Sequence, residues 1–333
     1  MSWKIGDLTF SRNLGLFPIF GNGQVATEVI SLQEGLENGW ISVRETGAVE
    51  KVVVEHHSGP DVLLLDGEEV VGAFQNRVFV TSVWMEAGQK ASVPVVCVEA
   101  GRWNGENVFR SAGFSAYPSL RAKTSYTLYQ SLKGKRVHQA DQSEVWNEVD
   151  SMLETLRISS ATRLMSDSFR KSHKELASYL DGVTSGSARK RNSSEKKGFA
   201  RENLEELIKD LPVLEGQTGF LAFTQRRILG ADIFGNESIF RKFYGKLLLS
   251  YLLDALADSL KEGGDMDADC ALNFLSRAEK WKQWKPFPAV AKGQEFWYAS
   301  SGVIGKSLSA NGGFLHLSLF PAPVGKSKRG GKG

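Results

Sequence analysis

The sequence predicts an α+β protein in which β-rich N-terminal and C-terminal parts share a sheet system and a helical section lies between them. Three observations predict this fold class. Short apolar runs with the two-residue alternation of strands occur within residues 40–98 and 295–320. Apolar side chains recur at helical spacing from residue 141 onward. The stretch 238–260 is apolar over a broad face, as expected of a long buried helix.

Residues 1–135 are predicted to form the β-rich N-terminal part, because β-branched and aromatic runs alternate with glycine turns. The dipeptide Asp66-Gly67 is typical of a hairpin turn, and Ala26–Leu36 has the spacing of a short helix. Pro94 indicates an edge position or a strand start, because proline donates no hydrogen bond to a sheet. Strands are expected at residues 40–43, 52–54, 61–65, 78–85 and 93–98.

The chain between residues 102 and 135 is predicted to be a long excursion over the surface. Glycine, serine, tyrosine and basic residues dominate it, and its apolar residues show little periodicity. Loops of this length are uncommon in compact domains and are often functional.

A helical section is predicted over residues 141–211. Apolar side chains recur at helical spacing in Gln142–Leu156 and Ser159–Leu180, and a third helix is expected at 199–211. The basic segment 182–198 between them is expected to be a disordered loop, because it has too few apolar residues to form a core.

Residues 216–320 are predicted to form an α+β C-terminal part that packs on the N-terminal part, followed by a flexible basic tail over 321–333. Its strands are expected to join the strands of Val62–Trp103 in the shared sheet system. The expected elements are a hairpin of Gly219–Thr224 with Ile228–Ile233, helices at 238–260 and 269–281, and strands at 295–299, 303–308 and 314–320.

The net charge of +3 is unevenly distributed. Segments 185–198 and 325–333 are strongly basic, so the remainder of the chain is mildly acidic. An acidic body argues against a basic nucleic-acid-binding face on the folded part. The basic segments are expected to be solvated tethers; the alternative is weak, salt-dependent contact with nucleic acid.

The composition indicates a cytoplasmic protein without a membrane segment. The N-terminus has no basic-then-apolar signal sequence, and no stretch reaches the roughly 18 apolar residues that would span a bilayer. Cys97 and Cys270 lie far apart and form no disulfide framework, which favours a reducing compartment.

Familiar catalytic motifs are absent from the sequence. It contains no GxxxxGKS/T phosphate loop, no GxGxxG after a strand, no GxSxG elbow and no HExxH helix. These absences disfavour ATPase, Rossmann dehydrogenase, serine hydrolase and zincin activities. No His/Cys/Asp spacing indicates a metal site, and the sequence identifies no cofactor.

Polar residues gather at the ends of the strands predicted within Val62–Trp103, and this stretch is the candidate site. Guanidinium groups bind carboxylate or phosphate in bidentate fashion, and a neighbouring carboxylate can act as general base on water. Glu68 and Glu99 are therefore the predicted catalytic residues. The predicted ligand-binding residues are Gln75, Asn76, Arg77, Arg102, Trp103 and His316.

A structural role is the alternative for each of these residues. Glu99 would then form an ion pair with Arg102 or Arg77. The other side chains would satisfy the backbone of a turn, cap the core or, for His316, make hydrogen bonds inside the protein.

Two segments resemble a known bacterial family. GEEVVGAFQNR at Gly67–Arg77 and PVVCVEAGRW at Pro94–Trp103 resemble the ADP-ribosylglycohydrolase and rhodanese-phosphatase superfamily associated protein domain, and the resemblance extends over roughly residues 8–320. It implies a role near NAD-derived or phosphorylated nucleotides, in a prokaryotic stress response or anti-phage defence. It implies no catalytic residues.

Two functions follow from these expectations. The first is binding of a phosphorylated, nucleotide-like small molecule, related to ADP-ribose or NAD, with or without its hydrolysis, in the Glu68–Trp103 region. The second is a non-enzymatic scaffold or interaction subunit of a defence complex, which requires protein partners or a homo-oligomer. The sequence alone names no reaction.

Overall fold

In this computed structural model the described residues are 3–11, 13–21, 27–172, 211–264, 266–278, 283–300, 302–310 and 313–322. The predicted disordered loop 182–198 lies outside them. So do the end of the helix predicted over 159–180, most of the helix predicted at 199–211 and the tail beyond residue 322.

Strands from both ends of the chain share one sheet, as predicted, and the α+β fold class is confirmed. Within the described residues nine antiparallel strands form this large sheet, in the order β1-β3-β13-β14-β18-β17-β16-β15 with β2 beside β3. The N-terminal strand β3 pairs directly with β13. The strands are β1 (Trp3–Ile5), β2 (Thr9–Ser11), β3 (Leu14–Gly21), β13 (Gly219–Phe223), β14 (Ile228–Phe234), β15 (Lys285–Pro288), β16 (Gln294–Ser300), β17 (Val303–Ala310) and β18 (Gly313–Pro321).

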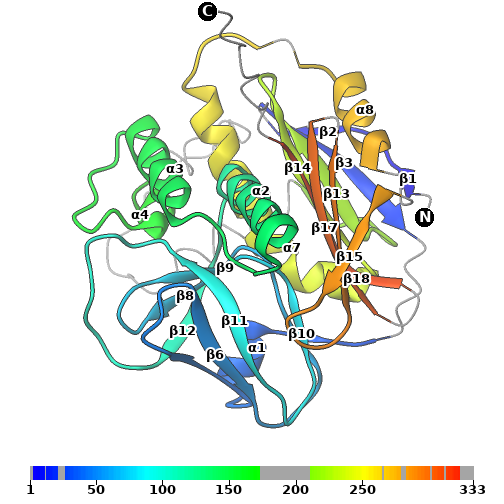
Figure 1. Ribbon diagram of the computed structural model, residues 1–333. Helices are drawn as coiled ribbons and strands as arrows, with labels where there is room; N and C mark the ends of the chain where they lie inside the picture. The colour runs from blue at the N-terminus through cyan, green and yellow to red at the C-terminus, as the bar shows by residue number, and fades with distance from the viewer. Residues whose placement is uncertain are drawn as a thin grey trace, which may run out of the picture.

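Helices cover both faces of the large sheet (Figure 1). α8 (Ala268–Ala278) packs on one face, where Phe274 is buried against apolar side chains of the strands. α2 (Pro118–Lys135) and α7 (Glu237–Ser259) cover the other face. The helix predicted at 238–260 is therefore confirmed.

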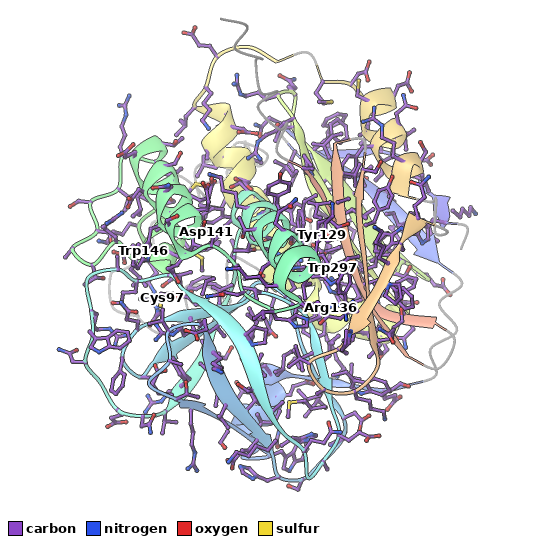
Figure 2. The ribbon with its side chains drawn as sticks, viewed as in Figure 1. Cys97, Tyr129, Arg136, Asp141, Trp146 and Trp297 are labelled. Carbon is purple, nitrogen blue, oxygen red and sulfur yellow. The ribbon has the colours of Figure 1, made fainter. Side chains whose placement is uncertain are left out.

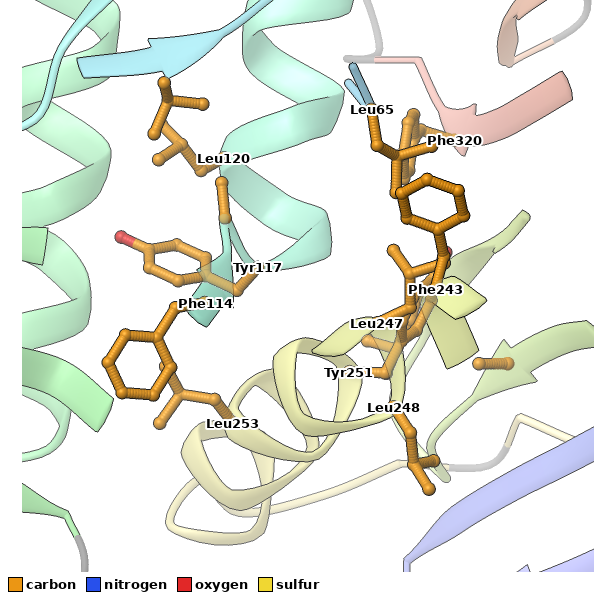
Figure 3. Close-up of a cluster of buried hydrophobic side chains, with 14 of the residues drawn as sticks. Leu65, Phe114, Tyr117, Leu120, Phe243, Leu247, Leu248, Tyr251, Leu253 and Phe320 are labelled. Atoms are coloured by element: carbon orange, nitrogen blue, oxygen red, sulfur yellow. The ribbon is translucent and has the colours of Figure 1, made fainter. Parts of the chain in front are cut away.

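Helix α7 lies at the centre of the largest apolar core. Its apolar residues are buried over a broad face, and every residue from Ser250 to Asp258 is buried, whereas Arg241 and Lys242 in the first half are exposed. Figure 3 shows Leu253 toward Phe114 and Tyr117, and Phe243 toward Phe320. α7 thus packs against both the strand that precedes α2 and β18, the C-terminal strand of the chain.

The strands between residues 30 and 115 form two further sheets. Within the described residues six strands pair in the order β12-β8-β9-β11-β6-β5, and three pair in the order β10-β7-β4. A bridge between Arg44 and Val108 joins the two edges of the six-stranded sheet, so we call it the curled sheet. The elements are β4 (Ile30–Ser31), α1 (Leu32–Glu37), β5 (Ile41–Glu45), β6 (Lys51–His56), β7 (Val62–Leu64), β8 (Glu68–Gly72), β9 (Arg77–Phe79), β10 (Val83–Met85), β11 (Lys90–Cys97) and β12 (Phe109–Ser115).

Three expectations about Val62–Trp103 are wrong. Its strands lie in these two sheets, not in the large sheet with the C-terminal strands. The strand predicted at 78–85 is divided into β9 and β10, which belong to different sheets. Asp66-Gly67 is a turn, with Gly67 at φ +89°, but it joins strands of different sheets and makes no hairpin.

Pro94 lies inside β11, not at an edge or strand start. β11 pairs with β6 up to Pro94 and with β9 from Val95 onward. The residue without an N–H donor therefore stands where the strand changes partners, and its carbonyl accepts a hydrogen bond from Val80 at 3.3 Å.

The surface excursion predicted for residues 102–135 is wrong for most of its length, because β12 and α2 occupy it. The alternation of β12 is interrupted by a register irregularity, with Gly113 at φ +76°. α2 has no apolar stripe because polar Arg121, Thr124 and Ser125 are among its buried residues. The two-residue alternation that indicates a strand and the apolar stripe that indicates a helix are thus both weak in this stretch.

Helix α3 (Gln142–Thr155) follows the prediction, with Asp141 as its N-cap. Its first residue also binds the curled sheet. The Gln142 amide accepts a hydrogen bond from the Cys97 N–H and donates one to the Cys97 carbonyl, both at 2.8 Å. The side chain thus pairs with β11 as a neighbouring strand would.

The helix predicted to begin at Ser159 begins later, as α4 (Met165–Lys171). Ser160 precedes it and accepts a hydrogen bond from the Leu164 N–H at 2.9 Å. No helix in the described part of the chain is long and apolar enough to cross a membrane.

A buried ionic network joins the large sheet to the β elements at residues 62–85. Arg121 of α2 donates two hydrogen bonds to Asp232 of β14, at 2.7 and 2.8 Å, and contacts Asp66 at 3.1 Å. Lys306 of β17 contacts Asp66 at 2.6 Å. Tyr251 of α7 donates to Asp232 at 2.8 Å. We call the four charged residues, all at most 5% exposed, the ionic junction.

The ionic junction keeps its central pair charged. Burial opposes the charge of Arg121, but Asp232 and Asp66 outweigh burial and raise the pKa of the guanidinium. Burial likewise opposes ionisation of Asp232, but Arg121 outweighs it and lowers the pKa of that carboxyl. Because each charge is compensated only by its partners, removing one partner leaves the others buried and unpaired.

We predict that Arg121→Met lowers the free energy of unfolding by about 3–5 kcal/mol, since Asp232 then loses its guanidinium partner and Asp66 keeps only Lys306. Urea denaturation followed by circular dichroism measures the loss. Arg110→Met on the exposed surface is the matched control and is expected to change stability by less than about 0.5 kcal/mol. Equal losses in the two variants would contradict the structural role of the junction.

Candidate functional site

Asn76, Glu99 and Arg102 converge at one end of the curled sheet. Arg102 forms an ion pair with Glu99 at 2.7 Å. The guanidinium also donates to Oδ1 of the Asn76 side chain at 3.0 Å and to three backbone carbonyls. Asn76 in turn donates to Glu69 at 2.9 Å. Every N–H of the Arg102 guanidinium therefore has a protein acceptor, as the structural alternative predicts.

Arg77 and Gln75 belong to a different group of contacts, around Glu45. The buried Arg77 guanidinium lies 3.3 Å from Glu45 and donates to Gln75 at 3.0 Å. Trp103 is 53% exposed, and its ring lies 5.7 Å from Arg77 Cζ and 5.6 Å from the Phe74 ring. Trp103 therefore covers the curled sheet while it keeps half of its surface in solvent.

Glu68 and His316 lie apart from both groups. Glu68 accepts a backbone N–H of its own turn at 2.7 Å and pairs with Lys246 of α7. His316 lies between Ser82 at 2.8 Å and Asp232 at 2.9 Å, next to the ionic junction. Burial lowers the pKa of His316, which Asp232 opposes, so the imidazole is neutral at pH 7.

The structure thus divides the predicted site residues among separate contacts. None of them lines any of the four cavities described in the molecule. Their catalytic and ligand-binding roles stay predictions.

Glu69, which Asn76 binds, has a strongly altered pKa. Burial raises the pKa of its carboxyl from 4.5 to about 7, although the hydrogen bond from Asn76 acts against this rise. The negative charge of Glu99 raises it further. The network around Asn76 therefore changes charge near neutral pH.

A groove lies along α2 where the curled sheet meets the large sheet. It consists of two cavities of about 610 and 680 Å³ that share Glu50 and Gln139. Lys51 and Pro94 of the curled sheet form one wall of the first cavity, and residues 286–290 form the opposite wall. The end of α2 and the turn that follows it border both cavities. We call this pair of cavities the α2 groove.

Charges of both signs line the groove: Glu50 and Asp141 are acidic, and the end of α2 supplies two of the three cations. Arg136 is the C-cap of α2, and its left-handed backbone (φ +57°) turns the chain back toward α3. Arg136 stands at this turn and Asp141 at the start of α3 (Figure 2). Lys51, Lys135 and Arg136 all line the groove, and within the described residues none has an ion-pair partner. Three cations are thus available to a ligand.

His138 lines the first cavity and contacts the buried carboxylate of Glu295. Nε2 of His138 is 3.0 Å from Glu295. Glu295 is 2% exposed and also accepts hydrogen bonds from Thr81 at 3.2 Å and from the Trp297 indole at 2.9 Å. If Nε2 donates to this carboxylate, Nδ1 of His138 is the proton acceptor. The carboxylate is fixed by the protein, so the imidazole is oriented.

The sequence did not predict this group. His138 and Glu295 are 157 positions apart, and no motif spacing joins them. Arg136 follows the stretch that was expected to be an irregular excursion. Recognising α2 as a helix would have placed Lys135 and Arg136 at its end, but not opposite residues 286–290.

We predict that Glu69→Gln removes a pH dependence of stability. The folded protein holds a proton on Glu69 between pH 4.5 and about 7, whereas the unfolded chain loses it, so this group makes folding less favourable as pH rises. Relative to the wild type, the glutamine variant is expected to gain roughly 2–3 kcal/mol between pH 4.5 and 8. Urea titrations at both pH values measure it. A constant difference between the two proteins would contradict the raised pKa.

The comparisons with known proteins give one match. The family model of the ARG and Rhodanese-Phosphatase-superfamily-associated Protein domain matches residues 2–200 and 185–320. No curated protein and no solved structure matches the chain. The family description records an association with ADP-ribosylglycohydrolase and rhodanese-phosphatase proteins. The matched ranges include both segments on which the resemblance was based and almost the whole chain, which therefore belongs to the ARG and Rhodanese-Phosphatase-superfamily-associated Protein domain family.

Proposed function

We propose that the chain binds a phosphorylated, nucleotide-like small molecule, related to ADP-ribose or NAD, in the α2 groove and that His138 acts as general base in its hydrolysis. The main support is the combination in one groove of three cations without ion-pair partners and an oriented histidine–carboxylate pair. The family association with ADP-ribosylglycohydrolase and phosphatase proteins agrees with this ligand class.

The groove suits an anionic ligand with an apolar part. Arg136 can hold phosphate oxygens through two parallel hydrogen bonds, and Lys51 and Lys135 add charge nearby. Phe287 and Pro286 supply an apolar wall for a planar ring. Each cavity falls within the roughly 300–1,000 Å³ typical of small-molecule sites.

Hydrolysis in this groove requires one base and no redox partner. Nδ1 of His138 takes a proton from water while the water oxygen forms a bond to phosphorus. The bond from phosphorus to the leaving oxygen breaks, and the imidazolium returns the proton to that oxygen. Glu295 stabilises the transient imidazolium through its hydrogen bond at 3.0 Å.

The region around Glu68, Glu99 and the two arginines is the less favoured location. Its side chains are held by protein groups, and none borders a described cavity. A prokaryotic stress or anti-phage context and a cytoplasmic location are part of the proposal and rest on the family and on composition.

A second candidate function is a non-enzymatic interaction subunit. Trp103 and Val108 are 53% and 50% exposed on the segment that joins β11 to β12. Exposed aromatic residues of this kind are enriched at protein interfaces. Light scattering and a pull-down with the purified protein distinguish the two candidate functions. A strict monomer that captures no partner argues against the interaction role.

We predict that Arg136→Gln weakens ADP-ribose binding at least about tenfold, because a charge-assisted contact worth at least about 1.4 kcal/mol is lost. Isothermal titration calorimetry with ADP-ribose, NAD and cyclic nucleotides measures affinity. Arg110→Gln is the control for a surface arginine outside the groove. Loss of binding in Arg77→Ala or Arg102→Ala, with Arg136→Gln unaffected, would move the site to the sequence-predicted region.

We predict that His138→Gln lowers the rate of ligand hydrolysis by about 100-fold or more while binding is retained. Chromatography of products from the titrated ligand measures the rate. Wild-type turnover with an unchanged rate in His138→Gln would contradict the assignment of the base.

A further inference from the structure

The two cavities of the α2 groove differ in chemistry. The first is bordered by apolar side chains such as Leu132, Val137 and Phe287. The second has valines in its lining as well, but a larger share of hydroxyl and amide groups borders it, among them Gln130 and Ser131. Such a division fits a ligand with one planar apolar part and one part rich in hydroxyl groups.

Cations stand on both sides of the boundary between the cavities. Lys135 lines the second cavity, and the next residue, Arg136, lines the first. The carbonyl end of α2 has a partial charge of roughly −0.5, which alone would disfavour an anion. Lys133, Lys135 and Arg136 at the same end exceed that charge several-fold. A group with two linked phosphates could therefore contact both Lys135 and Arg136.

Free polar side chains surround the second cavity. Within the described residues, no hydrogen-bond partner holds the side chains of Gln130, Ser131 or Gln139, nor the carboxylate of Glu50. By contrast, the Thr127 hydroxyl already binds backbone groups. Amide, hydroxyl and carboxylate groups are the donors and acceptors that bind sugar hydroxyls.

We propose that the ligand of the α2 groove is a nucleoside diphosphate that carries a second sugar. Its base lies in the first cavity, its two phosphates contact Arg136 and Lys135, and its distal sugar lies in the second cavity against Gln130, Ser131 and Glu50. This inference rests on the proposed function and specifies its ligand. Gln130 and Ser131 are specificity-determining residues, because they contact only the distal sugar.

Calorimetry with ADP, ADP-ribose and ADP-glucose tests the inference. The wild type is expected to bind at least one of the two sugar-bearing compounds at least tenfold more tightly than ADP. The double variant Gln130→Ala/Ser131→Ala is expected to abolish that preference and to leave ADP affinity unchanged. Both residues lie on the solvent side of α2, and circular dichroism verifies that the variant is folded.

The outcomes separate the two proposals. Equal affinity for ADP and both sugar-bearing compounds, or an equal loss for all three in the double variant, overturns the distal-sugar site and leaves the phosphate site intact. Binding of none of the three compounds by the wild type overturns the proposed function together with this inference.

Discussion

The bidentate contact between Arg121 and Asp232 is the interaction on which the arrangement of this protein depends. It fixes α2 against β14, and through Asp66 and Lys306 it also ties the large sheet to the turn between β7 and β8. Burying these charges costs several kcal/mol each before pairing. The network is therefore a determinant of geometry more than a source of stability, because other relative positions of the sheets would leave charges unpaired.

The α2 groove is a consequence of this geometry. One wall comes from the curled sheet, one from residues 286–290 in and after β15, and the end of α2 lies between them. Lys306 also lies 5.6 Å from the Trp297 ring, and the Trp297 indole binds Glu295, the partner of His138. β17, which carries Lys306 of the ionic junction, thus pairs with β16, which carries the carboxylate that orients the candidate base.

Elements with a strong hydrophobic periodicity were predictable from the sequence. Elements whose periodicity is interrupted by buried polar residues were not. α7 is apolar over a broad face and was predicted almost to its ends. α2 was missed because buried Arg121 belongs to the ionic junction and breaks the apolar stripe. At Val62–Trp103, the convergence of Glu99 and Arg102 was foreseeable from local spacing, whereas the partners of Arg77, Glu68 and His316 come from other elements. The His138–Glu295 pair depends wholly on tertiary structure.

Hydrogen–deuterium exchange with ADP-ribose, read by mass spectrometry, tests the central claim that the ligand site lies in the α2 groove. Ligand binding is expected to slow exchange at residues 130–139 and 286–290, which border the groove from two different parts of the chain. Slower exchange at residues 67–77 and 94–103, with the groove segments unchanged, would contradict the claim and locate the ligand at the end of the curled sheet.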